Sequence, residues 1–97
     1  SLQVRQAYLG VVNGIAQVKA LRQALISSES VLAASKLGQE VGVRTDLDVL
    51  NAQEQLHLTQ RDLFQAQYGY LISQLQLEAM VGTLSADDLA RVNQSLY

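Results

Sequence analysis

Few residues of this chain could do chemistry, and they do not form a pattern that binds a metal or drives catalysis. His57 is the only histidine, and no second ligand follows it at the spacing that would place two metal ligands on one helix face. The sequence has no cysteine, which removes disulfides and thiolate metal sites. We therefore expect His57 to be an ordinary core or surface side chain, with no metal ion and no cofactor.

Two pairs of neighbouring carboxylates could in principle act as general acid and base. They are Asp46 with Asp48, and Asp87 with Asp88. Each pair falls at a predicted helix N-terminus, where acidic side chains cap backbone amides and interact favourably with the helix dipole. Because capping accounts for these carboxylates and no nucleophile accompanies them, the sequence predicts a protein that is not an enzyme.

The element that must position the first of these pairs is a turn between two helices. Gly42 can take the left-handed backbone conformation that ends a helix. Thr45 can start the next helix, because its hydroxyl can accept from the amide of Asp48 while the Asp48 carboxylate accepts from the amide of Thr45. A glycine stop followed so closely by this capping box predicts the tip of a helical hairpin.

The segments on either side of the tip, residues 2–41 and 46–81, carry the seven-residue repeat of a coiled coil. Its bulky positions are Val4, Val11, Val18, Leu25, Leu32, Val49, Leu56, Leu63, Tyr70 and Leu77. Its mostly small positions are Ala7, Gly14, Leu21, Ser28, Ser35, Ala52, Thr59, Ala66, Ser73 and Met80. At about 1.5 Å per residue each arm would be about 55–60 Å long. The predicted fold is all-α, a long antiparallel coiled-coil hairpin whose arms approach closely.

Apolar side chains also lie outside this seam, where a hairpin alone would leave them in water. They are Tyr8, Leu9, Val12, Ile15, Ile26, Leu37, Leu50, Leu58, Phe64, Leu71, Ile72 and Leu75. The hairpin therefore needs further helices around it, and we expect the chain alone to self-associate. Since the sequence begins at Ser1 already in helical pattern, we expect it to be a segment of a longer protein.

The polar surface is unusual in being rich in amides and poor in charge. Gln53, Gln60, Gln67 and Gln74 share one heptad position, and only 16% of the residues are charged. This row suits the lining of a water-filled interior and a plain exposed face equally well. The basic residues are scattered, so we expect no nucleic-acid partner. No apolar run approaches the roughly 20 residues of a membrane span, so any membrane contact should lie outside this sequence.

A second stop signal follows the second arm. Gly82 can end the helix, and Ser85 with Asp88 three residues later can cap another one. We expect a short helix over about residues 86–95 that folds back on the base of the hairpin. The chain then divides into a hairpin, residues 1–81, and a following segment with a short helix, residues 82–97.

Four motifs in this order resemble the TolC family of outer-membrane channel proteins. They are Val41-Gly42-Val43-Arg44-Thr45, then Asp48-Val49-Leu50-Asn51-Ala52, Tyr68-Gly69-Tyr70-Leu71, and Gly82-Thr83-Leu84 through Asp88-Leu89. The likeness covers about residues 40–90, and the first arm shares only heptad character. Each motif alone is weak, but the ordered set is specific.

The resemblance implies a homotrimer in the outer membrane of a Gram-negative bacterium, with a β-barrel continued by a periplasmic α-helical barrel. This hairpin would belong to the second repeat of each chain and lie in the periplasm, and residues 82–97 would begin the equatorial region. The implied function is an exit duct for type I secretion or multidrug efflux. The implied partners are a periplasmic adaptor and, through it, an inner-membrane transporter.

The resemblance also assigns roles at the tip, which would form the gate and the adaptor-docking site. Its residues here are Gly42, Val43, Arg44, Thr45, Asp48 and Asn51. Arg44 matches the arginine that ties hairpins together in the closed state, and Asp48 matches an acidic ring that narrows the entrance and favours cations. Two positions depart from the family: Asn51 replaces a second aspartate, and Gln39 replaces a tyrosine of the closing network.

The main alternative is a coiled-coil scaffold, such as the hairpin of a periplasmic adaptor, that docks partners without forming a channel. The adaptor pattern has Arg, Leu and Ser at regular spacing near the tip. Seven residues after Arg44 stands Asn51 and not leucine, so the pattern is missing. A phage or flagellar helix pair is a second alternative, which the sharp turn and the later motifs do not favour.

Overall fold

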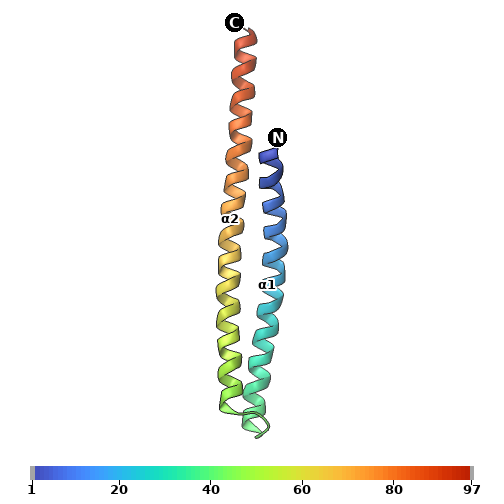
Figure 1. The fold of residues 1–97 in the computed structure, drawn as a ribbon, viewed down its shortest axis with the longest axis vertical. Coiled ribbons are helices and arrows are strands. Elements are labelled where there is room, and N and C mark those ends of the chain that lie inside the picture. The colour runs from blue at the N-terminus through green and yellow to red at the C-terminus, as the bar shows by residue number, and fades with distance from the viewer. Residues whose placement is uncertain (1, 97) are drawn as a thin grey trace.

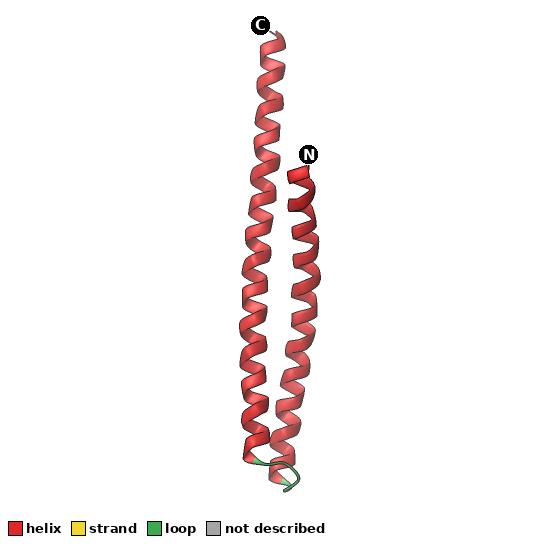
Figure 2. Ribbon diagram, viewed as in Figure 1, coloured by secondary structure: helices red, strands yellow, loops and turns green. Residues whose placement is uncertain are grey.

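Two long helices joined by a short turn form the described part of the chain. The computed structural model describes residues 2–96, with side chains described through residue 83 and at residues 90 and 93. Helix α1 spans Leu2–Glu40 and helix α2 spans Asp46–Leu96. They run antiparallel in a rod of 83 × 15 × 14 Å, with the turn at one end and the C-terminal part of α2 extending beyond the start of α1 at the other (Figures 1 and 2). The predicted all-α hairpin is confirmed.

The interface between the helices is the predicted heptad seam. Every bulky and every small position of the seam is buried or partly buried. The core is centred on Val18, Leu63 and Ala66, with Leu21, Leu25 and Tyr70 packed against it. Because burial of one stripe on each helix stabilises both at once, the hairpin forms from helices that would be marginal alone.

The small positions bring the two backbones close together. Among the least exposed side chains are Thr59 at 4%, Ser35 at 5% and Ala52 at 6%. At Gly14, an added Cβ would lie only 3.3 Å from Cδ1 of Tyr70, so the aromatic ring packs directly on the α1 backbone. This agrees with the predicted close approach of a small track to a bulky one.

A polar layer interrupts the apolar seam near its middle. Ser28 of α1 and Thr59 of α2 are both buried, and their hydroxyls are 3.3 Å apart in a hydrogen bond. Thr59 also donates to the carbonyl of Gln55 at 2.9 Å, and the Gln55 side-chain amide donates to Thr59 Oγ1 at 3.2 Å. A paired polar layer of this kind is favourable only in one register of the two helices.

The predicted helix end at Gly82 is wrong. Helix α2 continues through this residue to Leu96, and among the described residues only Gly42 has a positive φ. Near the position of the expected stop, Thr83 donates its hydroxyl to the carbonyl of Ala79 at 2.9 Å, one helical turn back. An interior glycine costs about 1 kcal/mol relative to alanine, which a helix of this length tolerates. The side chains of Ser85 and Asp88 lie outside the described residues.

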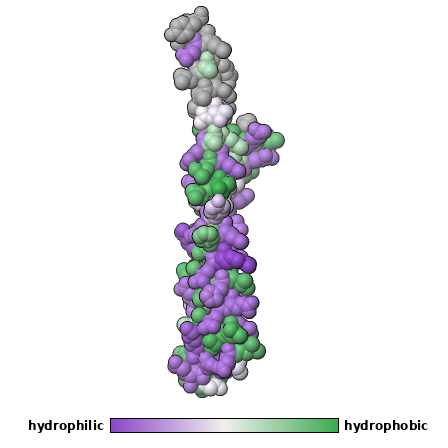
Figure 3. Space-filling view, turned by 90° about the vertical axis from the view of Figure 1, so that its left-hand side faces the viewer, coloured by the Kyte–Doolittle hydropathy of each residue, from purple (hydrophilic) through white to green (hydrophobic). Residues whose placement is uncertain are grey.

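A substantial apolar surface remains exposed on the hairpin. Each off-seam apolar residue named from the sequence is exposed, from Ile72 at 37% to Phe64 at 70%. On the face of the rod that Figure 3 shows, apolar patches are interspersed with polar ones. Within the described residues, neither helix contains a stretch long and apolar enough to cross a membrane.

Candidate functional site at the hairpin tip

Helix α1 ends at the tip in a closed set of backbone hydrogen bonds. Gly42 has a φ of 84°, and its amide donates to the carbonyl of Gln39 at 3.1 Å. The amide of Val43 donates to the carbonyl of Gly38 at 2.8 Å, which completes a Schellman motif. The predicted glycine stop at Gly42 is confirmed, and it turns the chain without leaving these carbonyls unpaired.

Helix α2 begins with the predicted capping box. The amide of Thr45 donates to Oδ2 of Asp48 at 2.9 Å, and the amide of Asp48 donates to Oγ1 of Thr45 at 3.2 Å. The bond from the Thr45 backbone, then the bond with its side chain, lower the pKa of the Asp48 carboxyl, and the charge of Arg44 adds to this against slight desolvation. Asp48 is therefore an ionised cap at neutral pH.

A side-chain contact joins the two helices across the tip. The amide of Gln39, in the last turn of α1, donates to Oδ1 of Asp46, the first residue of α2. The resemblance had pointed to Gln39 only as a departure from the family, and sequence reasoning did not predict this contact. Its signal in the sequence is weak, because a glutamine and an aspartate seven residues apart meet only once the turn geometry is known.

Arg44 lies against the end of α1. Its Cβ and Cγ cover Gly38, where an added Cβ would overlap Arg44 Cγ and lie 3.2 Å from Arg44 Cβ. Gly38 is buried as a result, although it belongs to neither seam track. Among the described residues the one ion pair joins Arg61 and Asp62, so the Arg44 guanidinium has no carboxylate within 4.0 Å.

The other tip residues named from the sequence are also accessible. Val43 is 75% exposed, and Asn51 is exposed one turn into α2 beyond Asp48. Three further apolar side chains surround the tip: Val41 at 66%, Leu47 at 62% and Leu50 at 58% exposed. The tip thus combines a fixed backbone with an apolar rim and one unpaired cation, which suits contact with another protein.

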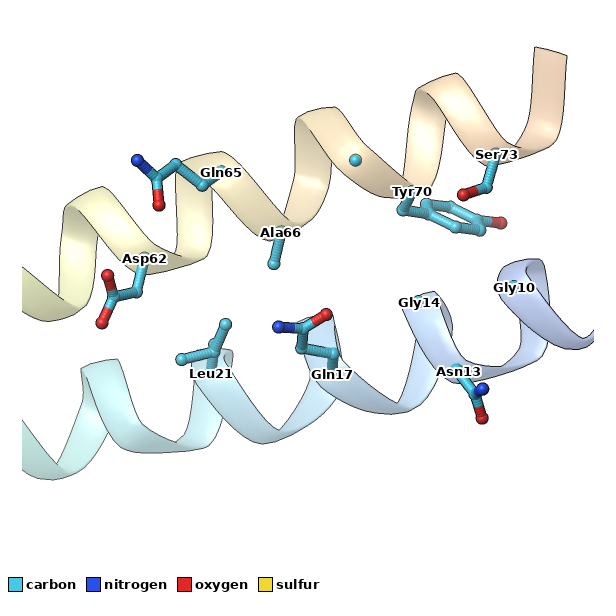
Figure 4. A pocket seen from close by; sticks show the side chains of 11 residues that line it. Gly10, Asn13, Gly14, Gln17, Leu21, Asp62, Gln65, Ala66, Tyr70 and Ser73 are labelled. Carbon is cyan, nitrogen blue, oxygen red and sulfur yellow. The ribbon is translucent and has the colours of Figure 1, made fainter. Parts of the chain in front are cut away.

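A groove between the helices lies away from the tip, where Gly14 faces Tyr70 and Gly10 faces Ser73 (Figure 4). Figure 4 shows the Tyr70 ring lying between the helices, with Gln17 and Asp62 also pointing into the space. Its lining carries amides and one carboxylate but no histidine, cysteine or lysine. This groove is not among the features expected from the sequence, although small residues opposite a tyrosine are its signal. No three potential metal ligands gather anywhere in the described part of the chain.

The geometry defines the class of molecule. A rod with one buried seam, an apolar outer surface and an accessible, doubly capped tip is a coiled-coil hairpin whose exposed apolar surface further helices could bury. The chain belongs to the outer membrane efflux protein family, whose model matches residues 2–83. The resemblance to the TolC family is thereby confirmed, and with it the outer-membrane localisation that it implied.

Individual relatives agree with this membership. The outer membrane protein TolC of Vibrio cholerae serotype O1 is 41% identical over 92 residues, which cover 94% of this chain and 21% of that protein. TolC of Escherichia coli strain K12 is 38% identical over 93 residues, or 96% of this chain and 19% of that protein. The alkaline protease secretion protein AprF of Pseudomonas aeruginosa is 31% identical over 90 residues, 93% of this chain and 19% of that protein.

These relatives are much longer than this chain. The chain spans about a fifth of the length of each of them. Their names and that of the family describe outer-membrane, efflux and secretion proteins, which agrees with the function class expected from the sequence.

Proposed function

We propose that this hairpin is a periplasmic segment of the α-helical barrel of a trimeric outer-membrane exit duct for efflux or type I secretion. Family membership over residues 2–83 supports the duct over the alternative of an adaptor hairpin or scaffold. The exposed apolar residues outside the seam support it physically, because a barrel of side-by-side helices would bury them. In this proposal the segment has a structural and gating role and is not an enzyme.

The tip, Gly42 to Asn51, is proposed as the gate and as the docking site of a periplasmic adaptor, which links the duct to an inner-membrane transporter. The state of Arg44 supports this proposal most directly. Its side chain is exposed beside a fixed turn, and its guanidinium has no ion-pair partner within the described residues. Such a cation can make charge-assisted hydrogen bonds to a neighbouring hairpin and exchange them for bonds to a partner. Asp48, ionised and near the entrance, would favour the passage of cations.

The test is the conductance of the full-length protein in a planar lipid bilayer, wild type beside Arg44→Ala. Loss of a charge-assisted hydrogen bond of about 1.5–3 kcal/mol should raise the ratio of open to closed states by about tenfold or more. Arg22→Ala is the matched control, because it removes an exposed positive charge from the middle of α1, far from the tip.

Three outcomes separate the alternatives. A small, cation-preferring conductance that rises in Arg44→Ala and not in Arg22→Ala supports a channel gated at this tip. An equal conductance of all three proteins would remove the gate from the proposal and leave the duct. No conductance from folded, membrane-inserted protein would favour the scaffold.

A further inference from the structure

The tip holds one cation close to two aspartates of its own chain, and the cation binds neither. Arg44 precedes Asp46 by two residues and Asp48 by four, and Glu40 lies at the end of α1. None of these carboxylates lies within 4.0 Å of the guanidinium, since the one ion pair among the described residues is Arg61 with Asp62. Exposed ion pairs are weak, so modest contacts that hold the carboxylates or the arginine elsewhere are enough to decide whether Arg44 pairs within its own hairpin.

We propose that Gln39 and Gly38 are positioning residues that keep Arg44 from pairing within its own hairpin and so leave it available to an acceptor on a neighbouring helix. The inference rests on the proposed function, because it assigns Arg44 a partner outside this hairpin. Gln39 acts by occupying the carboxylate of Asp46, and Gly38 acts by giving the Arg44 stem a place on α1.

The carboxylate of Asp48 is already engaged. One of its oxygens accepts the amide of Thr45 at 2.9 Å, and the Asp48 amide returns a bond to the Thr45 hydroxyl at 3.2 Å. Movement of Asp48 toward Arg44 would leave the first turn of α2 without its cap. The capping box therefore holds Asp48 at the start of α2, where it feels the charge of Arg44 but forms no ion pair with it, and Asp46 is the other aspartate beside Arg44.

Gln39 engages Asp46, the other aspartate beside Arg44. Its side-chain amide donates to Oδ1 of Asp46, so the carboxylate is held toward the last turn of α1. A glutamine is suited to this position because its amide satisfies an acceptor without adding charge. A cation here would also bind Asp46, but it would repel the guanidinium of Arg44.

Gly38 fixes the direction of the Arg44 side chain. The Cβ and Cγ of Arg44 fill the space that a side chain at position 38 would occupy, and Val43 Cγ2 borders the same space at 3.4 Å. The amides of Val43 and Arg44 both donate to the carbonyl of Gly38, at 2.8 and 3.1 Å. The backbone and the stem of Arg44 are therefore placed by the same glycine.

The closing experiment combines conductance with structure in the full-length protein. In planar bilayers, Gln39→Ala should raise the resting conductance, because the freed Asp46 pairs with Arg44 and weakens its outside contact. An exposed local ion pair competes by about two- to fivefold, so the rise should be smaller than that of Arg44→Ala. Adding Asp46→Ala to Gln39→Ala should return the conductance to the wild-type value. Gln23→Ala, an exposed glutamine in the middle of α1, is the control.

The structural test is a cryo-electron microscopy map of the full-length Gln39→Ala variant. We expect the Arg44 guanidinium within ion-pair distance of Asp46, in contrast to the wild type. An Arg44 side chain unchanged in this map would overturn the inference, whatever the conductance. A rise in Gln39→Ala that persists in the double variant would also overturn it, because capture by Asp46 would not be its cause.

The same design separates this inference from the proposed function. If Arg44→Ala leaves the conductance unchanged, the gate is lost, and the map still decides whether Gln39 keeps Arg44 from Asp46. A Gly38→Ala variant gives a second structural test, since its Cβ must displace Arg44 Cγ. An Arg44 stem that keeps its place on α1 in Gly38→Ala would contradict the role of Gly38.

Discussion

At the scale of single residues, the path of the chain depends on Gly42. Its φ of 84° lies in the left-handed region, and an added Cβ would meet nothing within 4 Å. The cost of Gly42→Ala is therefore conformational and not steric, about 1–2 kcal/mol. We expect this variant to lower the thermal unfolding midpoint of the chain, followed by circular dichroism at fixed concentration.

Gly69→Ala is the matched comparison. Gly69 lies within α2 with helical φ, is exposed, and likewise has nothing within 4 Å of an added Cβ. Alanine should stabilise the helix here by about 0.5–1 kcal/mol. Shifts of the same sign in the two variants would contradict the assignment of Gly42 as the left-handed stop.

The capping box makes the stability of the tip depend on pH. The pKa of Asp48 is lowered in the folded chain from its ordinary value of 3.8 by its bonds to Thr45. The carboxylate therefore contributes stability above pH 3.8 that is lost as the pH falls through the lower folded pKa. We expect Asp48→Asn to be less stable than wild type at neutral pH, with the difference shrinking in acid. Unfolding curves of the two proteins at neutral pH and in acid below pH 3.8 check this. A difference in stability that stays constant between the two conditions would contradict it.

Among single residues, the interactions that could be predicted from the sequence are those between close neighbours in the chain at helix ends. Gly42, Thr45 and Asp48 obey local rules of helix ends, so their roles were readable from residue types and spacing. The Gln39 contact with Asp46 and the packing of Arg44 on Gly38 depend on how the chain folds back. No local rule contains that information.

At the scale of helices, the Ser28–Thr59 layer should be unequal in its two halves. Thr59 has a second partner in the Gln55 carbonyl at 2.9 Å, whereas the one bond described for the Ser28 hydroxyl is with Thr59. Thr59→Val should destabilise the hairpin by about 1–3 kcal/mol, because it leaves a buried hydroxyl unpaired. Ser28→Ala should cost less than about 1 kcal/mol, since Thr59 keeps its bond.

Urea unfolding of the two single variants and of the double variant measures this difference. The double variant should be no less stable than Thr59→Val alone, because both polar partners are then gone. Equal losses in the two single variants would show that the layer does not act through an unpaired hydroxyl.

The two glycines predicted to end helices, Gly42 and Gly82, behave differently because of their surroundings. At Gly42 the chain turns back and α2 packs along α1. At Gly82 the register, which sets Gly10 against Ser73 and Gly14 against Tyr70, places α2 near the start of α1. Beyond that point no described segment offers a surface on which a second short helix could fold. A glycine permits a helix end, but packing decides whether it is used, and the division at residues 81 and 82 stays a prediction.

At the scale of the whole molecule, the exposed apolar surface should make the separate chain associate. Phe64 is 70% and Leu71 is 49% exposed, and they lie seven residues apart on one face of α2. Phe64→Gln with Leu71→Gln should shift sedimentation velocity profiles toward the monomer, while Gln23→Ser should not. A wild-type chain that stays monomeric at high concentration would contradict the need for neighbouring helices. This exposed surface could be predicted once the seam was identified in the sequence, because a two-helix contact can bury only one stripe of each helix and leaves the other apolar residues in water.

The antiparallel hairpin also has a mechanical consequence. The turn lies at one end of the rod, and α1 starts part of the way along α2 toward the other end (Figure 1), so a rigid tilt of the hairpin about its base would displace the tip most. With an arm of about 58 Å for 39 residues, a tilt of about 5° would move the tip by about 5 Å, roughly the pitch of one helical turn. If the hairpin tilts as a rigid body, side chains at its base would therefore change how far the tip moves without contacting Arg44.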